Sequence, residues 1–231
     1  MRSYLLALII IAAVVLIACA PAQTAPPEQK LGEIGPSVVA TEDDDTPILR
    51  RENADLRDMV EKQSAVKSVS FDVATLPDMG AWAKYYVRGD KAKVIPASAI
   101  DMNGWTADTV YVDFTAKTAE AYCIELSSCK KENRAATVDF ARYDIELPTQ
   151  WGDRVVYGER TGGVTFNSRQ VTVVRWEENG KTFEAYIDPF YGVMHRAAVL
   201  DLSKDPPAVI GGYEYRDITY NTVKAEDVVA S

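Results

Sequence analysis

Few side chains of this sequence could carry out chemistry, and their types narrow the options. The 231 residues contain one histidine, His195, and three cysteines. A serine–histidine–aspartate triad would need a serine beside His195, yet Ser168 and Ser203 lie in ordinary loop sequences and no G-x-S-x-G motif is present. A triad needs three matched roles and the sequence suggests one. We therefore expect His195 to be structural or exposed, and the chain not to be an enzyme.

Cofactor and metal chemistry find as little support. A single histidine leaves too few ligands for a zinc site. The pairs Gly162-Gly163 and Gly211-Gly212 are typical of turns and belong to no P-loop or G-x-G-x-x-G motif. Glu177 and Glu178 are neighbours in an expected strand, so they point to opposite faces and do not form a glycosidase pair. We expect no cofactor and no metal.

A different chemistry is indicated at the N-terminus, where Cys19 follows an apolar run. Arg2 precedes the uncharged stretch 4–18, which is shorter than the ~20 residues of a transmembrane helix and therefore favours a secretory signal. Leu16-Ile17-Ala18-Cys19 is similar to the lipobox of prokaryotic lipoproteins. That resemblance implies a signal peptide at residues 1–18 and a diacylglycerol on Cys19. An ordinary signal peptide that happens to end near a cysteine is the alternative.

Residues 19–45 are expected to be a tether between the lipid anchor and the folded domain. They contain four prolines and end in Glu42-Asp43-Asp44-Asp45, and proline with like charges keeps a chain extended and solvated. As a flexible coil, such a segment spans roughly 30 Å. The protein would thus be exported and anchored to the outer face of the cell membrane, or to an outer membrane if the cell has one.

The other two cysteines, Cys123 and Cys129, fall six positions apart at the end of an expected strand. In an exported domain, this spacing favours a structural disulfide over metal or redox use, because the C-x-x-C spacing of redox motifs is absent. The loop that it closes is short, so the expected stabilisation is about 2 kcal/mol.

Composition is that of a globular protein, with 47% hydrophobic and 26% charged residues. The 34 acidic residues exceed the 25 basic ones, for a net charge of −9. Such a balance argues against a nucleic-acid partner, because nucleic-acid binding needs a basic field.

Residues 46–231 are expected to form one α+β domain that begins with a helix. Thr46-Pro47 supplies a capping hydroxyl and a proline at the first helical position, which predicts a helix over 47–64. Leu56, Met59 and Val60 fall on one side of it at helical spacing, so the helix is amphipathic enough to pack on a sheet.

From Lys67 onward, apolar residues alternate with polar ones, which predicts half-buried strands joined by tight turns in an antiparallel meander. Turns are expected at 88–91 and at 178–181, where Asn179-Gly180 suits a type I′ hairpin. The stretch 130–152 is less periodic, and 138–143 could be a short helix. The expected strands cover about 69–73, 83–87, 110–114, 169–177, 181–188, 193–200 and 212–220.

The order of one helix and then many strands is similar to the Lol-type lipoprotein carrier and receptor superfamily. Three stretches within residues 47–221 carry the resemblance: 84–94, with a short glycine turn before a basic strand; 186–194, where Asp188 ends a strand and Gly192 begins the next; and the closing strand 213–221. The resemblance implies a strongly curved, unclosed half-barrel of about eight to ten strands, which holds acyl chains in its apolar hollow. The helix would pack on the concave side.

Two functions follow as expectations. The first is a membrane-anchored, monomeric lipoprotein that serves in lipid or lipoprotein trafficking. Its concave face would bind an apolar ligand, either a lipid or a lipoprotein acyl chain. The second is a non-catalytic structural or interaction module of the cell envelope, whose own helix fills that face. A cryptic hydrolase is a third option of low weight. No family residue matches a particular position, so the ligand-binding residues stay unassigned.

Overall fold

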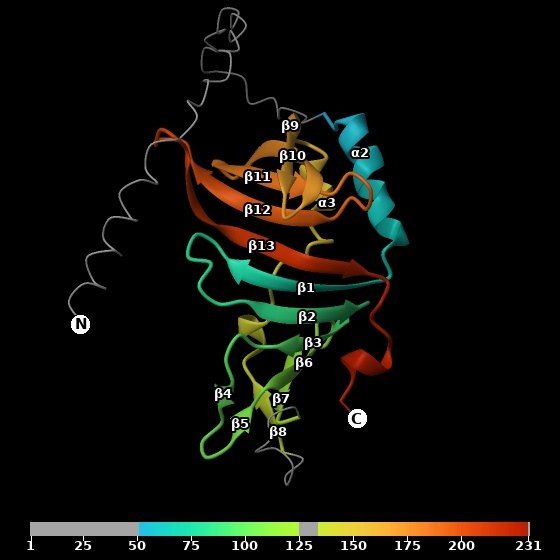
Figure 1. Cartoon of the computed structure of the whole chain (residues 1–231), viewed down its shortest axis with the longest axis vertical. Coiled ribbons are helices and arrows are strands. Elements are labelled where there is room, and N and C mark those ends of the chain that lie inside the picture. Colours follow the sequence, from blue (N-terminus) through green and yellow to red (C-terminus); the bar gives the residue numbers. More distant parts are fainter. Residues whose placement is uncertain (1–50, 125–133, 231) are drawn as a thin grey trace, which may run out of the picture. The chain divides into compact units, whose positions relative to one another are not determined.

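The computed structural model of the chain describes residues 51–124 and 134–230 (Figure 1). The expected signal peptide (1–18), the lipidation site Cys19, the tether (19–45) and Cys129 lie outside the described residues. The account below concerns the described ranges.

Within these two ranges, eleven strands form a single antiparallel sheet whose two edges do not meet (Figure 1). A small separate hairpin is made by β4 (Ile100–Asp101) and β5 (Thr106–Ala107). The strands of the large sheet are β1 (Ser68–Thr75), β2 (Ala83–Arg88), β3 (Lys91–Ile95), β6 (Thr109–Asp113), β7 (Thr118–Tyr122), β8 (Ala135–Val138), β9 (Glu159–Phe166), β10 (Arg169–Glu178), β11 (Lys181–Ile187), β12 (Met194–Asp201) and β13 (Ala208–Tyr220).

The strand order is β8-β7-β6-β3-β2-β1-β13-β12-β11-β10-β9, so the sheet consists of two meanders joined at its centre. The first meander starts at the centre with β1 and runs outward to β8. The second starts at the opposite edge with β9 and returns to the centre with β13. The first and last strands pair with each other, for example Val69 with Tyr220 and Val73 with Tyr215. The expected α+β fold with a curved antiparallel sheet is confirmed, with eleven strands in place of eight to ten and two meanders in place of one.

One face of the sheet, called here the inner face, carries the hydrophobic core. Paired strands place Phe71, Tyr85, Val94, Val110 and Ala121 in one row across five strands, and all five are buried. The row forms because alternate residues of a strand point to the same side. The opposite, outer face carries ion pairs such as Arg175–Glu184 at 2.7 Å.

The inner face is crossed by residues 139–158, called here the cover segment. The chain has to cross because β8 and β9 occupy opposite edges of the sheet. The segment contains two short helices, η3 (Phe140–Arg142) and α3 (Gly152–Val155). Its side chains Tyr143, Leu147, Trp151 and Val155 are all buried in the core. The short helix expected near 138–143 is thus confirmed as the 3₁₀ helix η3.

The N-terminal helix α2 (Ala54–Glu61), followed by the 3₁₀ turn η1 (Lys62–Ala65), begins later than predicted. Asn53 caps it, because its side chain accepts hydrogen bonds from the backbone N–H groups of Asp55 and Leu56 at 3.1 and 3.3 Å. The start at Thr46-Pro47 is therefore wrong for the helix that forms. Leu56 joins the inner-face core as expected, with Met59 and Val60 packed against it.

Both predicted hairpin turns are confirmed. Asn179 and Gly180 have φ values of 51° and 71°, as a type I′ turn requires, and Glu178 pairs with Lys181. Gly89 has a φ of 60° between the paired residues Arg88 and Lys91. In both turns the sequence carries a residue that tolerates positive φ, which is why the local pattern is sufficient.

Gly212 provides a test of how closely β12 and β13 approach each other. Its φ is +119°, and a Cβ built on it would overlap the backbone of Ala197 and Ala198 in β12, whereas a Cβ on Gly211 would meet no atom. We expect Gly212→Ala to lower the free energy of unfolding by at least about 2 kcal/mol, from strained backbone plus steric overlap. Gly211→Ala is the matched control and should change it by less than about 0.5 kcal/mol. Urea unfolding measures both, and equal effects would contradict the close approach.

Candidate functional site

The inner face was the expected ligand site, and it divides into two parts of different character. Beneath the cover segment, over β2, β1, β13 and β12, it is filled by large side chains. Phe71 stacks on Tyr85 with ring centroids 5.5 Å apart and meets the edge of Tyr215 at 5.6 Å. The indole N–H of Trp151 donates to the Tyr215 hydroxyl at 3.1 Å, and that hydroxyl donates to the carbonyl of Glu146 at 2.5 Å. This part is a packed core.

The other part of the inner face, over β3, β6 and β7, has a floor of small side chains. Alanine and valine alone supply it: Ala92, Val94, Val110, Val112, Ala119 and Ala121, all buried. Large apolar residues that remain partly exposed pack against the core cluster to which this floor belongs: Ile100, Met102, Trp105, Phe114, Val138, Phe140 and Ile145. The floor side chains are at most 2% exposed and therefore covered, whereas the partly exposed residues keep apolar surface within reach of solvent. This is called here the alanine floor and its rim.

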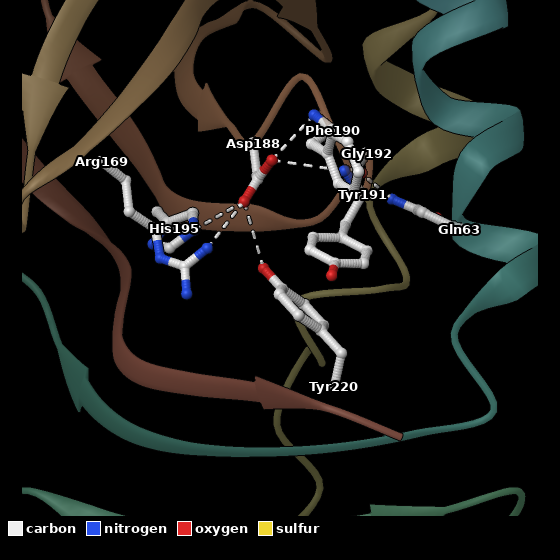
Figure 2. Close-up of polar contacts among 8 residues, drawn as sticks. All are labelled: Gln63, Arg169, Asp188, Phe190, Tyr191, Gly192, His195 and Tyr220. Carbon is white, nitrogen blue, oxygen red and sulfur yellow. Dashed lines mark hydrogen bonds and ion pairs between the residues drawn. The ribbon is translucent and has the colours of Figure 1, made fainter. Parts of the chain in front are cut away.

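A buried polar cluster lies at the β11–β12 reversal and is centred on Asp188 (Figure 2). One carboxylate oxygen accepts the backbone N–H groups of Phe190 and Tyr191 at 2.8 and 3.2 Å. The other faces Arg169 Nη1 at 3.3 Å, the Tyr220 hydroxyl at 3.4 Å and His195 Nε2 at 3.8 Å. These partners come from β10, β13 and β12, so one carboxylate links three strands.

The electrostatics of this cluster favour the ionised carboxylate. Burial of Asp188 opposes ionisation, but His195 and the N–H groups of Phe190 and Tyr191 outweigh it and lower the pKa of Asp188 to about 2. Burial, followed by the nearby Asp188 charge, raises the pKa of the Tyr220 hydroxyl. The aspartate is therefore charged and the tyrosine neutral at physiological pH.

The same loop is fastened to the N-terminal helix. Gln63 donates to the carbonyl of Gly192, as Figure 2 shows, and Lys62 donates to the carbonyl of Pro189 at 2.7 Å. Gly192 has a φ of +69°, and a Cβ there would collide with the Met59 backbone, so only glycine allows this approach. β11 ends at Ile187, one residue before Asp188, and β12 begins at Met194, two residues after Gly192, so both residues lie in the reversal between the two strands.

His195 lies in this cluster and is 2% exposed. It occupies the irregular point of the β11–β12 ladder, where the pairing shifts between Tyr186 and Ile187. In the described part of the chain, neither ring nitrogen has a hydrogen-bond partner, so neither Ser168 nor Ser203 stands beside it. The structure places the Asp188 carboxylate near His195, but no described serine forms a hydrogen bond with this histidine. Of the two expected placements, structural or exposed, His195 is buried.

The remaining predicted site residues are only partly placed. Cys123 follows β7 directly, at a strand end as expected. Its expected partner Cys129 and the lipidation site Cys19 lie outside the described residues, so the disulfide and the anchor stay predictions. No helix in residues 51–124 and 134–230 is long and apolar enough to span a membrane. The same ranges hold no group of three or more His, Cys, Asp or Glu side chains placed to bind a metal.

Sequence reasoning missed the alanine floor and its rim, and it missed the cluster around Asp188. The floor carried a signal, because Ala119 and Ala121 alternate with exposed residues in the strand that was expected to end near Cys123. The partners of Asp188 carried none, because Arg169 and Tyr220 reach it only through the pairing of distant strands.

Asp188→Asn tests the Asp188 cluster. Because the pKa is depressed from 3.8 to about 2, the charged group stabilises the fold above pH 4, and this stability is lost as the pH falls from about 4 to 2. A shift of this size corresponds to about 2 kcal/mol. We expect Asp188→Asn to lower the free energy of unfolding at pH 7 by about that amount and to flatten its fall between pH 4 and 2. Asp144→Asn, at an exposed aspartate, is the control. An unchanged acid profile in Asp188→Asn would contradict the assignment.

Comparisons with known proteins find similar structures but no similar sequence. No family model matches the chain, and no curated protein matches its sequence. Among solved structures, MucB in complex with MucA(peri) has a TM-score of 0.45 at 12% identity, over 78% of this chain and 60% of that one. The Pseudomonas aeruginosa MucA/MucB complex gives 0.44 at 11% identity, over 77% and 61%. LprF from Mycobacterium bovis gives 0.41 at 12% identity, over 77% and 99%. The chain thus spans about three fifths of the MucB chains it resembles.

Proposed function

We propose that this chain is an exported, lipid-anchored, non-catalytic protein that holds an acyl chain of a lipid or lipoprotein between the alanine floor and its rim. The observation that carries the proposal is the contrast within the inner face. One part is filled by aromatic side chains, whereas the other has a floor of alanine and valine, and the large side chains of the rim, which pack against the same core, stay partly exposed. Binding sites for apolar ligands combine this kind of lining with access from solvent.

Part of the rim belongs to a hairpin that lies outside the large sheet. The hairpin of β4 and β5, with Met102 and Trp105, is paired only within itself and is not a strand of the large sheet. Ala107 of this hairpin is buried in the core, whereas Ile100, Met102 and Trp105 are only partly buried. Elements with few buried contacts open at low free-energy cost, so an acyl chain can enter by displacing rim side chains while the sheet stays intact.

A structural or interaction module is the second candidate, and it too has a specific observation in its favour. The cover segment buries Tyr143, Leu147, Trp151 and Val155 against the inner face, so most of that face already has an occupant from its own chain. Under this alternative the rim side chains would simply complete the core. The two candidates differ in whether anything but the chain itself contacts Trp105.

Site-specific photocrosslinking separates the two candidates. The photoreactive residue p-benzoylphenylalanine replaces Trp105 on the rim or, as the matched control, Trp82, over which Arg216 stacks at 3.7 Å. The full chain is produced in bacteria, irradiated in the cells and purified for mass spectrometry. We expect a lipid-sized adduct on the peptide that carries position 105 and none on the peptide that carries position 82. Absence of an adduct at 105, or the same adduct at both positions, would favour the structural module.

The lipid anchor has its own test. Cys19→Ser removes the thiol that would receive the diacylglycerol, and we expect the protein to move from the membrane pellet to the soluble fraction. Fractionation with immunodetection measures this, and Cys123→Ser is the control, because it changes a cysteine outside the lipobox. A Cys19→Ser protein that stays in the membrane would support a transmembrane N-terminus.

A further inference from the structure

The C-terminal segment folds over the strand ends of β1, β2 and β3, as Figure 1 shows. A hollow lies there, away from the inner-face site. It has a volume of about 500 Å³. Three cations line it: Lys67, Arg88 and Lys91. Its remaining lining residues are small or apolar: Gly89, Ala225, Val228 and Val229. This is called here the basic pocket.

The basic pocket is positively charged, whereas the protein as a whole is negatively charged. The whole chain has a net charge of −9, yet the residues that line this hollow carry three positive charges and no negative one. Among the described residues, neither Lys67 nor Arg88 forms an ion pair, and Lys91 lies 4.0 Å from Asp113 at the pocket's border. A recess lined by one sign of charge concentrates ions of the opposite sign.

Hydrogen bonds to backbone carbonyls hold two of the three cations, and these bonds use only some of the N–H donors of each side chain. Arg88 donates from Nη1 to the carbonyl of Val223 at 2.9 Å, which uses one of its five N–H donors. Lys67 donates to the carbonyl of Ser64 at 2.7 Å, which uses one of its three donors. The strand ends are fixed too, because the Asn221 side chain accepts from the Lys67 backbone N–H at 2.6 Å. The pocket therefore keeps its shape without a ligand.

We propose that the basic pocket binds a phosphate-type oxyanion, with an apolar part of the same ligand resting on Val228 and Val229. Arginine and lysine are the side chains that phosphate oxygens bind best, and arginine adds a two-pronged contact. Two sources supply this chemistry, a phospholipid headgroup and free inorganic phosphate. The site is separate from the alanine floor, so it stands or falls independently of the acyl-chain proposal.

The test is protection of lysines from a membrane-impermeant acetylating reagent, read by mass spectrometry on the full chain. One arm adds millimolar inorganic phosphate to the chain in mild detergent. The other compares the chain in phosphate-free galactolipid vesicles with the chain in the same vesicles containing phosphatidylglycerol. The exposed residues Lys117, Lys181 and Lys204 serve as controls within the same molecule.

We expect acetylation of Lys67 and Lys91 to slow about tenfold when the site is nine-tenths occupied, because only the free fraction reacts, with no change at the control lysines. Slowing by phosphate alone identifies a site for the free anion, and slowing only with phosphatidylglycerol identifies a headgroup site. No slowing in any arm, or equal slowing at the control lysines, would overturn the proposal.

Two matched variants link the protection to the pocket. Arg88→Gln should abolish most of the slowing at Lys67 and Lys91, whereas Arg142→Gln, the same change at an exposed arginine elsewhere, should leave it intact. If Arg88→Gln lowers the melting temperature, Lys91→Gln replaces it, with Lys67 as the reporter. Full protection in the pocket variants would show that the anion binds elsewhere.

Discussion

The pairing of the first strand with the last decides most of this structure. Because β1 and β13 lie together at the centre, the two meanders must end at opposite edges, β8 and β9. The chain between those edges then has no route except across the sheet, and it takes the apolar face. The cover segment is therefore a consequence of topology.

The second constraint is electrostatic and acts at the β11–β12 reversal. A buried carboxylate is costly unless it is paired and hydrogen-bonded, and Asp188 is both. Its partners belong to β10, β12 and β13, and its loop binds the turn that follows α2. The helix is thus oriented by polar contacts at its C-terminal end, by the cap at Asn53, and by burial of Leu56. Hydrophobic packing alone would leave its direction less well defined.

Much of the fold could be predicted from local pattern, and much of the site could not. Alternation predicted β1, β2, β6 and β10 to β13, and Asn179-Gly180 predicted its turn, because these signals act between near neighbours. β9 was missed because all but one of its residues are exposed, which erases alternation. The helix start was misplaced because two capping signals compete, Thr46-Pro47 and Asn53.

The role of filling the inner face was given to the helix, whereas the unpatterned stretch near 139–158 performs it, since an irregular segment carries no periodic signal. The basic pocket gathers residues from two strands and the C-terminus, and no sequence window contains them all.

The central pairing also has a consequence for the order of events during synthesis. Val69 finds its partner Tyr220 only after nearly the whole chain has been made, and such distant contacts form slowly. Until then each meander has an open strand edge where the other belongs. The N-terminal meander alone is therefore not a finished sheet. This order also means that the last strand is the one whose arrival converts two partial sheets into a single domain.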